Sequence, residues 1–229
     1  MTRTCRIATT MLIATVAIAL TATASAGVIG VSHSGSNDPE TQGFTVQNAA
    51  SGSADGGSWS MTNGGAGRYI ADHPPAGGAD HTLPATGRWI SSGGTIGTVI
   101  MWEPDADQSA QLCFNDDGSG IWARGGTGTY AVDTTVDRTY QITYSGGVQK
   151  AYVDGNYAFD LAIGEWAGLD NFYGGFFLGS ASSAQTGASA WSTLQVETGL
   201  NVMAAIPEPP ALLLLATGLV GLFGIGRQR

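Results

Sequence analysis

Three carboxylates stand at alternate positions in the segment Glu103-Pro104-Asp105-Ala106-Asp107. On a β-strand this spacing places the three side chains on one face. Two carboxyl groups about 5–5.5 Å apart serve as nucleophile and acid in a retaining glycosidase. Pro104, however, has no backbone N–H and is disfavoured in a central strand. The segment therefore predicts a solvated loop, and the active site of a glycan hydrolase or lyase is the alternative.

A second acidic group lies in Asn115-Asp116-Asp117-Gly118, between two apolar segments. This composition predicts a hairpin turn. Asp116 and Asp117 are also candidate calcium ligands, because Ca²⁺ binds several carboxylate and carbonyl oxygens. Apart from this calcium alternative the sequence predicts no cofactor. The histidines have no cysteine or carboxylate at zinc-binding spacing: His33, His73 and His81.

The tryptophans are the remaining side chains with a functional alternative: Trp59, Trp89, Trp102, Trp122, Trp166 and Trp191. Most are expected in the core, since a domain without disulfides needs large apolar side chains. Trp166 and Tyr173 fall in a polar and aromatic stretch between strand-like segments, where binding residues concentrate. Trp166, Tyr173 and Trp122 are therefore the predicted ligand-binding residues, stacking on sugar rings.

The composition narrows the class of protein. Glycine accounts for 35 of 229 residues and charged residues for only 12%, which argues against a coiled coil or helical bundle. Five of the nine basic residues and 17 of the 18 acidic ones lie within 27–205, so this part has a net charge near −12. Such a charge is unfavourable for binding nucleic acid or anionic lipid.

The N-terminus has the pattern of an export signal. Arg3 and Arg6 precede an apolar run over residues 7–20, and Ala24 and Ala26 form the small-x-small motif of a signal-peptidase site. We therefore predict that residues 1–26 are a signal peptide.

Export has a consequence for the cysteines. Cleavage by signal peptidase removes Cys5 and leaves Cys113, so no intramolecular disulfide can form. Cys113 stands between Leu112 and Phe114 in a strand-like run, which predicts a buried, unreactive thiol.

The C-terminus, residues 206–229, combines three elements in fixed order. Pro207, Glu208 and Pro209 precede an uncharged apolar run over 211–225, and Arg227 and Arg229 end the chain. As a helix the run is about 22 Å long at 1.5 Å per residue, shorter than the roughly 30 Å hydrocarbon core of a bilayer.

This end resembles the PEP-CTERM sorting signal. The resemblance implies recognition by an exosortase-type membrane protease and transient insertion of 211–225 into the inner membrane, with the terminal arginines cytoplasmic. It further implies cleavage near the Pro-Glu-Pro tripeptide and delivery to the cell surface or extracellular matrix of a Gram-negative bacterium. An ordinary C-terminal membrane anchor is the alternative.

A different sorting motif occurs within the chain. The residues of 83–87, Leu-Pro-Ala-Thr-Gly, match the pentapeptide of Gram-positive sortases. No apolar tail follows this motif, so we interpret the match as a coincidence.

Between the two ends, short aromatic and β-branched segments alternate with glycine-rich breaks. About a dozen strands, roughly 8–14 residues apart, predict an all-β fold, an antiparallel β-sandwich over 27–205. The predicted strands are 43–47, 57–62, 68–71, 87–91, 97–102, 110–114, 120–124, 128–132, 138–144, 148–153, 156–163, 174–179 and 188–196.

The strand pattern is clearest over 138–163. Tyr140, Ile142 and Tyr144 alternate with polar residues, Ser145-Gly146-Gly147 predicts a turn, and Asp154-Gly155 predicts another. This meander resembles the central strands of concanavalin A-like and laminin G-like jelly rolls. The resemblance covers roughly residues 100–196 and implies a jelly-roll fold.

These features together predict a secreted, exosortase-sorted surface or matrix protein that is not an enzyme and that binds or organises extracellular polysaccharide. A glycan hydrolase or lyase of the concanavalin A-like fold, using Glu103, Asp105 and Asp107, is one alternative. A purely structural biofilm-matrix or adhesion protein is another. The expected partners are signal peptidase, the exosortase-type protease and polysaccharide, and not nucleic acid.

Overall fold

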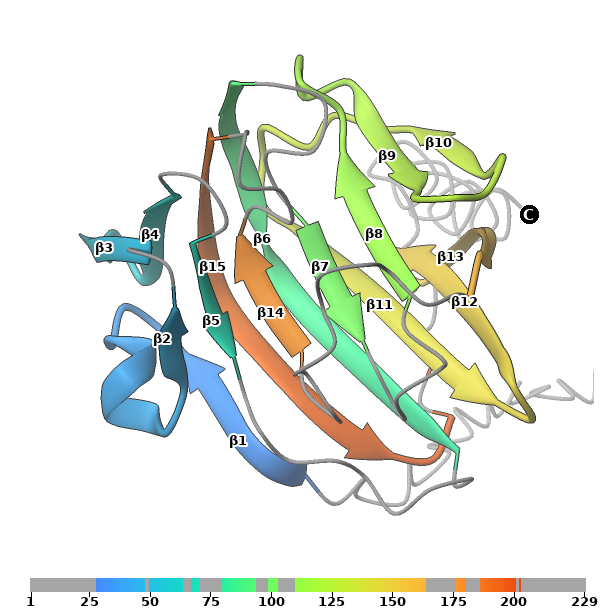
Figure 1. The fold of residues 1–229 in the computed structure, drawn as a ribbon, viewed down its shortest axis with the longest axis horizontal. Coiled ribbons are helices and arrows are strands. Elements are labelled where there is room, and N and C mark those ends of the chain that lie inside the picture. The colour runs from blue at the N-terminus through green and yellow to red at the C-terminus, as the bar shows by residue number, and fades with distance from the viewer. Residues whose placement is uncertain are drawn as a thin grey trace, which may run out of the picture.

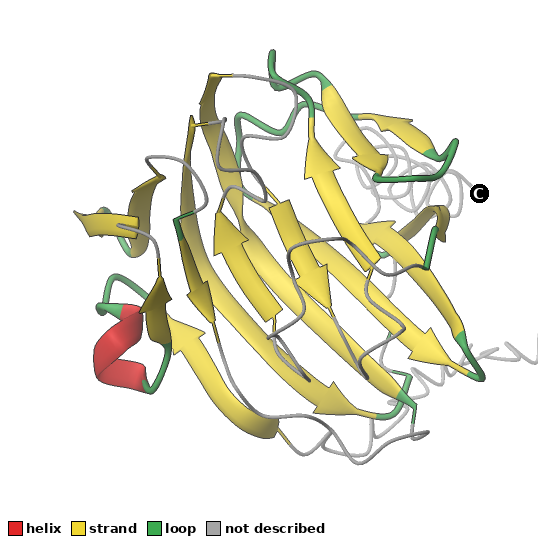
Figure 2. Ribbon diagram, in the orientation of Figure 1, coloured by secondary structure: helices red, strands yellow, loops and turns green. Residues whose placement is uncertain are grey.

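Alternating apolar residues and glycine turns divide the chain into strands that assemble as two antiparallel sheets, packed face to face (Figures 1 and 2). The computed structural model describes residues 28–47, 50–63, 67–70, 80–93, 99–102, 110–163, 176–179, 186–200 and 202. Within these residues the single helix is a short 3-10 helix, η1 (Pro39–Gln42).

Sheet A contains the two longest strands at its centre. Its order is β13 (Asn156–Leu161), β12 (Val148–Val153), β11 (Arg138–Ser145), β6 (His81–Gly93), β15 (Thr186–Thr198), β4 (Ser58–Asn63) and β3 (Ala50–Asp55), with β1 (Val28–Ser34) also paired to β15. Sheet B has the order β10 (Thr129–Ala131), β9 (Gly120–Ala123), β8 (Ala110–Phe114), β7 (Val99–Trp102), β14 (Phe176–Gly179), β5 (Arg68–Ile70) and β2 (Thr45–Gln47).

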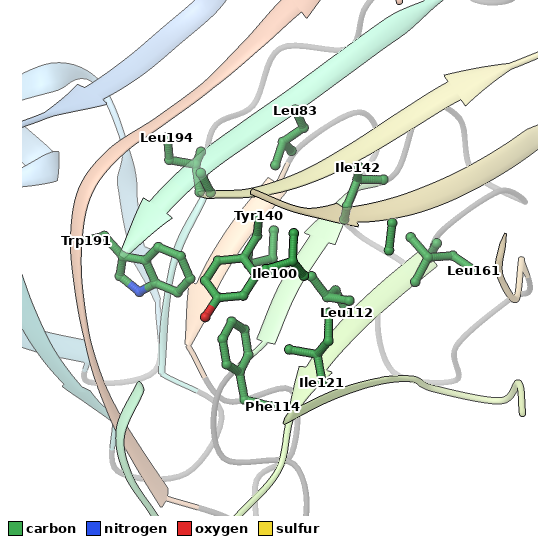
Figure 3. Packing of buried hydrophobic residues seen from close by; sticks show 14 of the residues in the cluster. Leu83, Ile100, Leu112, Phe114, Ile121, Tyr140, Ile142, Leu161, Trp191 and Leu194 are labelled. Carbon is green, nitrogen blue, oxygen red and sulfur yellow. The ribbon is translucent and has the colours of Figure 1, made fainter. Parts of the chain in front are cut away.

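The core lies between the sheets and is built largely from alternate residues of the central strands, several of which Figure 3 labels. Tyr140 of β11 and Phe114 of β8 meet edge to face, with ring centroids 4.8 Å apart, and both rings contact the indole of Trp191 in β15. Tyr140, Ile142 and Tyr144 are all buried in this cluster. The alternation predicted for the strand over 138–144 is therefore confirmed.

The turns of the 138–163 meander are also confirmed. Gly146 and Gly147 link β11 to β12 with φ of 55° and 80°, as a two-residue hairpin turn requires. Asp154 and Gly155 link β12 to β13 with φ of 49° and 79°. The carboxylate of Asp154 accepts hydrogen bonds from the backbone N–H of Thr139 at 2.9 Å and from Nη1 of Arg138 at 2.8 Å. These bonds hold the non-glycine residue in its left-handed conformation.

Two strands were not among the predicted ones, and a third is longer than predicted. β1 and β3 were missed, and β6 begins at His81 instead of residue 87. β1 has no strong alternation, but it is fixed by buried His33, whose ring nitrogens lie 2.9 Å from the carbonyl oxygen of Trp191 and 2.8 Å from Oε1 of Gln42. Tertiary hydrogen bonds therefore determine this strand more than local propensity does.

The start of β6 was missed because it contains Pro84, a residue that usually excludes a central strand. Pro84 nevertheless lies opposite Gln141 of β11, in a strand that also pairs with β15. Leu83 and Ala85 on either side of it are buried in the core. The Leu-Pro-Ala-Thr-Gly sequence is thus part of a central strand, which supports its interpretation as a coincidental match.

Several predictions concern residues outside the described part of the chain. They are the signal peptide 1–26 with Ala24 and Ala26, the sorting signal with Pro207, Glu208, Pro209, Arg227 and Arg229, the apolar run 211–225, the carboxylates Glu103, Asp105 and Asp107, and Trp166, Tyr173 and His73. These remain predictions. Within the described residues, no helix has the length and apolar character needed to span a bilayer.

Candidate functional site

The turn between β8 and β9 carries the predicted calcium ligands. The N–H of Asn115 donates to the carbonyl of Gly120 at 2.9 Å, and the N–H of Gly118 donates to the carbonyl of Asn115 at 3.2 Å. The predicted hairpin turn is therefore confirmed. Asp117 accepts a hydrogen bond from the N–H of Ser119 at 2.8 Å, and hydrogen bonding by Ser119 lowers the pKa of this carboxyl.

Both aspartates of this turn, Asp116 and Asp117, are exposed to solvent. Among the described residues, no three or more His, Cys, Asp or Glu side chains are grouped so that they could hold a metal ion. The geometry thus explains Asp117 as a residue that stabilises the turn, and calcium binding remains a prediction.

The hairpin places Trp122, a predicted ligand-binding residue, on the face of sheet B that points away from sheet A. Leu112 pairs with Ala123 and both are in the core, whereas Cys113 pairs with Trp122. Because side chains alternate along a strand, Gln111, Cys113, Trp122 and Arg124 share the opposite face. We call these four residues the β8–β9 patch. Trp122 and Arg124 are half-buried, and Gln111 and Cys113 are fully buried.

Gln111 and Arg124 are joined by two hydrogen bonds across the hairpin. The backbone N–H of Arg124 donates to the carbonyl of Gln111 at 3.2 Å, and Nη1 of Arg124 donates to Oε1 of Gln111 at 2.9 Å. The second bond fixes the orientation of the carboxamide. Within the described part of the chain, Nε2 of Gln111 is buried and has no hydrogen-bond partner. A buried donor left unpaired in this way lowers the free energy of unfolding by about 1–3 kcal/mol.

Cys113, the fourth member of the patch, is a buried free cysteine, as predicted. Burial raises the pKa of its thiol to about 12. The thiol is therefore protonated at neutral pH, and a thiolate nucleophile is not available there. With no carboxylate or histidine among its four residues, the β8–β9 patch has no side chain suited to acid–base catalysis near neutral pH.

The chemistry of the patch fits binding. An indole offers an apolar face on which a ring can stack, and a guanidinium offers N–H donors. A sugar ring presents one apolar face and several hydroxyl acceptors, so it matches this combination.

Sequence reasoning identified Trp122 but missed Gln111 and Arg124. Their position two residues from Cys113 and Trp122 in adjoining predicted strands was the signal that could have identified them. The core tryptophans behave as expected where they are described, since Trp59 and Trp191 are buried and Trp89 packs against the core.

Comparison with known proteins is informative about the fold. No protein-family model and no curated protein matches this chain. Among solved structures, the alginate lyase AlgAT5 from Polysaccharide Lyase family 7 is similar over 76% of this chain and 95% of its own, with a TM-score of 0.51 and 14% identity. A protein of unknown function with a galectin-like fold from Bacillus subtilis is similar over 75% and 96%, with a TM-score of 0.51 and 8% identity.

At these identities the likeness is one of fold. The described chain is an antiparallel β-sandwich of the jelly-roll type, and the predicted fold class is confirmed.

Proposed function

We propose that this chain is a secreted, non-enzymatic protein that binds extracellular polysaccharide through the β8–β9 patch. The observation that carries the proposal is the pair of half-buried side chains, Trp122 and Arg124, that share one outward face, with the guanidinium of Arg124 oriented by its hydrogen bond to Gln111. A sugar hydroxyl can accept a hydrogen bond from a guanidinium, and the sugar ring can stack on the indole. The likeness of fold to an alginate lyase of a polysaccharide lyase family supports a carbohydrate ligand.

The test is a comparison of Trp122→Leu with Trp122→Phe. The leucine variant removes the aromatic face and should bind polysaccharide at least tenfold more weakly, equivalent to about 1.4 kcal/mol. The phenylalanine variant keeps a stacking surface and should stay within roughly threefold of the unmodified chain. Affinity electrophoresis against a panel of neutral and acidic polysaccharides measures both.

A second substitution tests the polar half of the patch. Arg124→Met removes the guanidinium donors and should weaken binding at least as much as Trp122→Leu, with a thermal midpoint that shows the fold is retained. Equal affinity of all variants, or no binding of the unmodified chain to any polysaccharide of the panel, would contradict the proposal. Release of sugar products during the assay would instead favour the glycan hydrolase or lyase alternative.

We also propose that the chain reaches the cell surface or matrix by exosortase-dependent sorting. The boundaries of the fold support this proposal. β1 begins at Val28, two residues after Ala26, and β15 ends at Thr198, before Pro207. Removal of both predicted terminal segments therefore cuts none of the described strands.

Mass spectrometry of the exported protein tests the sorting proposal. We expect an N-terminus at Gly27 and a C-terminus near Pro207 that lacks Arg227 and Arg229. Substitution of Glu208 by alanine should preserve the tail, because the tripeptide is then disrupted. An exported, unmodified protein that still carries Arg229 would overturn the proposal.

A further inference from the structure

A groove lies on the face of sheet A that points away from sheet B, and thus on the opposite side of the sandwich from the β8–β9 patch. Its volume is about 310 Å³, within the size range of small-ligand sites. Its floor is formed by Thr143 and Ser145 of β11 and by Val148, Lys150 and Tyr152 of β12.

The register of β11 and β12 explains why these residues line one face. Thr143 pairs with Lys150, and Ser145 pairs with Val148. The adjacent pair, Ile142 and Ala151, is buried in the core between the sheets. The groove residues therefore point outward by the two-residue alternation of both strands.

The other wall comes from the segment that follows β15. The N–H of Gly199 donates to the carbonyl of Asp80 at 2.7 Å, and the carbonyl of Gly199 accepts from Oγ1 of Thr82 at 2.8 Å. These bonds fix the turn that brings Leu200 and Val202 to the groove, where both are exposed. The groove is therefore formed by segments that are distant in sequence and are held together by hydrogen bonds.

Lys150 is the charged residue among those that line the groove. Among the described side chains, Arg88 and Arg138 form ion pairs with aspartates, whereas Lys150 forms none. Asp160 lies opposite Lys150 in β13, but its Oδ1 accepts a hydrogen bond from the hydroxyl of Tyr157 at 3.1 Å. In a chain with a net charge of −9, an ammonium group without an ion pair in a groove favours an anionic ligand.

Aromatic side chains lie on the same hairpin as Lys150. Tyr152 lines the groove, and its ring meets that of Tyr157 edge to face, with centroids 5.8 Å apart. Tyr157 is 54% exposed. The tyrosine pair offers a stacking surface to a ligand. The hydroxyl groups offer neutral hydrogen-bonding partners, and the ammonium group offers a positive charge.

We propose that this groove binds a carboxylate-bearing sugar residue. Its carboxylate contacts Lys150, its hydroxyls contact Thr143 and Ser145, and the apolar face of its ring lies on Tyr152. This site is separate from the β8–β9 patch and lies on the other sheet, so it goes beyond the proposed function and does not depend on it.

The experiment compares Lys150→Met with Lys150→Arg in the full-length chain, using trigalacturonate and the neutral maltotriose as probes in calorimetry. The unmodified chain should bind trigalacturonate more tightly than maltotriose. The methionine variant should lose at least tenfold in affinity for trigalacturonate, and the arginine variant should stay within about threefold. Higher salt should weaken binding by the unmodified chain and have little effect on the methionine variant.

Variants of the β8–β9 patch separate the two proposals. Val136→Ala, a substitution at an exposed residue that belongs to neither site, should leave the binding of trigalacturonate unchanged if the groove is the site. Loss of this binding in Trp122→Leu but not in Lys150→Met would place the acidic sugar at the patch and overturn the groove proposal while supporting the proposed function. Absence of trigalacturonate binding by the unmodified chain would also overturn it. Retained fold is checked by the thermal midpoint of each variant.

Discussion

Replacement of Trp191 by alanine is expected to lower the free energy of unfolding by about 4 kcal/mol. The indole is fully buried at the centre of sheet A and contacts the rings of Phe114 and Tyr140. Its Nε1–H donates to Oγ of Ser189 at 2.8 Å, and that hydroxyl is also buried. The substitution therefore creates a large cavity and removes a hydrogen bond. Chemical denaturation followed by circular dichroism measures the change.

Two control variants show whether burial is the cause. Trp191→Phe keeps much of the aromatic packing and loses the hydrogen bond, so about 2 kcal/mol is expected. Tyr157→Ala removes an aromatic ring that is 54% exposed and should cost less than about 1 kcal/mol. Similar losses for the Trp191→Ala and Tyr157→Ala variants would contradict this account of the core.

Replacement of Gly87 by alanine is expected to cost about 3 kcal/mol, although it adds a single methyl group. Gly87 pairs with Trp191 across β6 and β15. A Cβ atom at Gly87 would lie 2.3 Å from the carbonyl oxygen of Ala190 and 2.5 Å from Cε3 of Trp191. The first contact is with backbone, so the two central strands would have to move apart. Denaturation midpoints of the purified variant measure the effect.

Gly126→Ala is the matched control for Gly87→Ala. A Cβ there would lie 3.3 Å from the methyl groups of Ala123 and Ala162 and 3.7 Å from the carbonyl oxygen of Ala123, so a loss below about 1 kcal/mol is expected. In a Trp191→Ala background, Gly87→Ala should cost less than in the unmodified chain, because the indole contact is absent. Strict additivity of the two substitutions would show that the glycine does not accommodate the indole.

Most of the strands could be predicted from the sequence because their causes are local. The alternation of Tyr140, Ile142 and Tyr144 and the glycines of the turns at 146–147 and 155 are properties of a few adjacent residues. β1 and the start of β6 could not be predicted in this way. β1 is held by hydrogen bonds of His33 to Gln42 and Trp191. The start of β6 contains Pro84, which is unfavourable in a strand, but pairing with β11 makes this segment a strand nevertheless.

The same distinction between local and long-range causes applies to the residues of the two candidate sites. Trp122 was identifiable as an aromatic residue in a glycine-punctuated region. The pairing of Gln111 with Arg124 depends on the register of β8 and β9, and the unpaired amide nitrogen depends on burial in the assembled sheet. The groove beside Lys150 depends in addition on Gly199, which brings the segment after β15 back to Asp80 and Thr82.

Local sequence patterns were sufficient to predict the all-β class and most of the strands and turns, whereas the export and sorting segments at the two ends remain predictions. Which strands are neighbours, and which outward-facing residues lie together, became clear from the folded structure. Strand periodicity and turn chemistry act over a few residues, whereas sheet order and register depend on packing between residues far apart in the chain. Gly87 beneath Trp191 is the clearest example, because neither residue specifies the other until β6 and β15 pair.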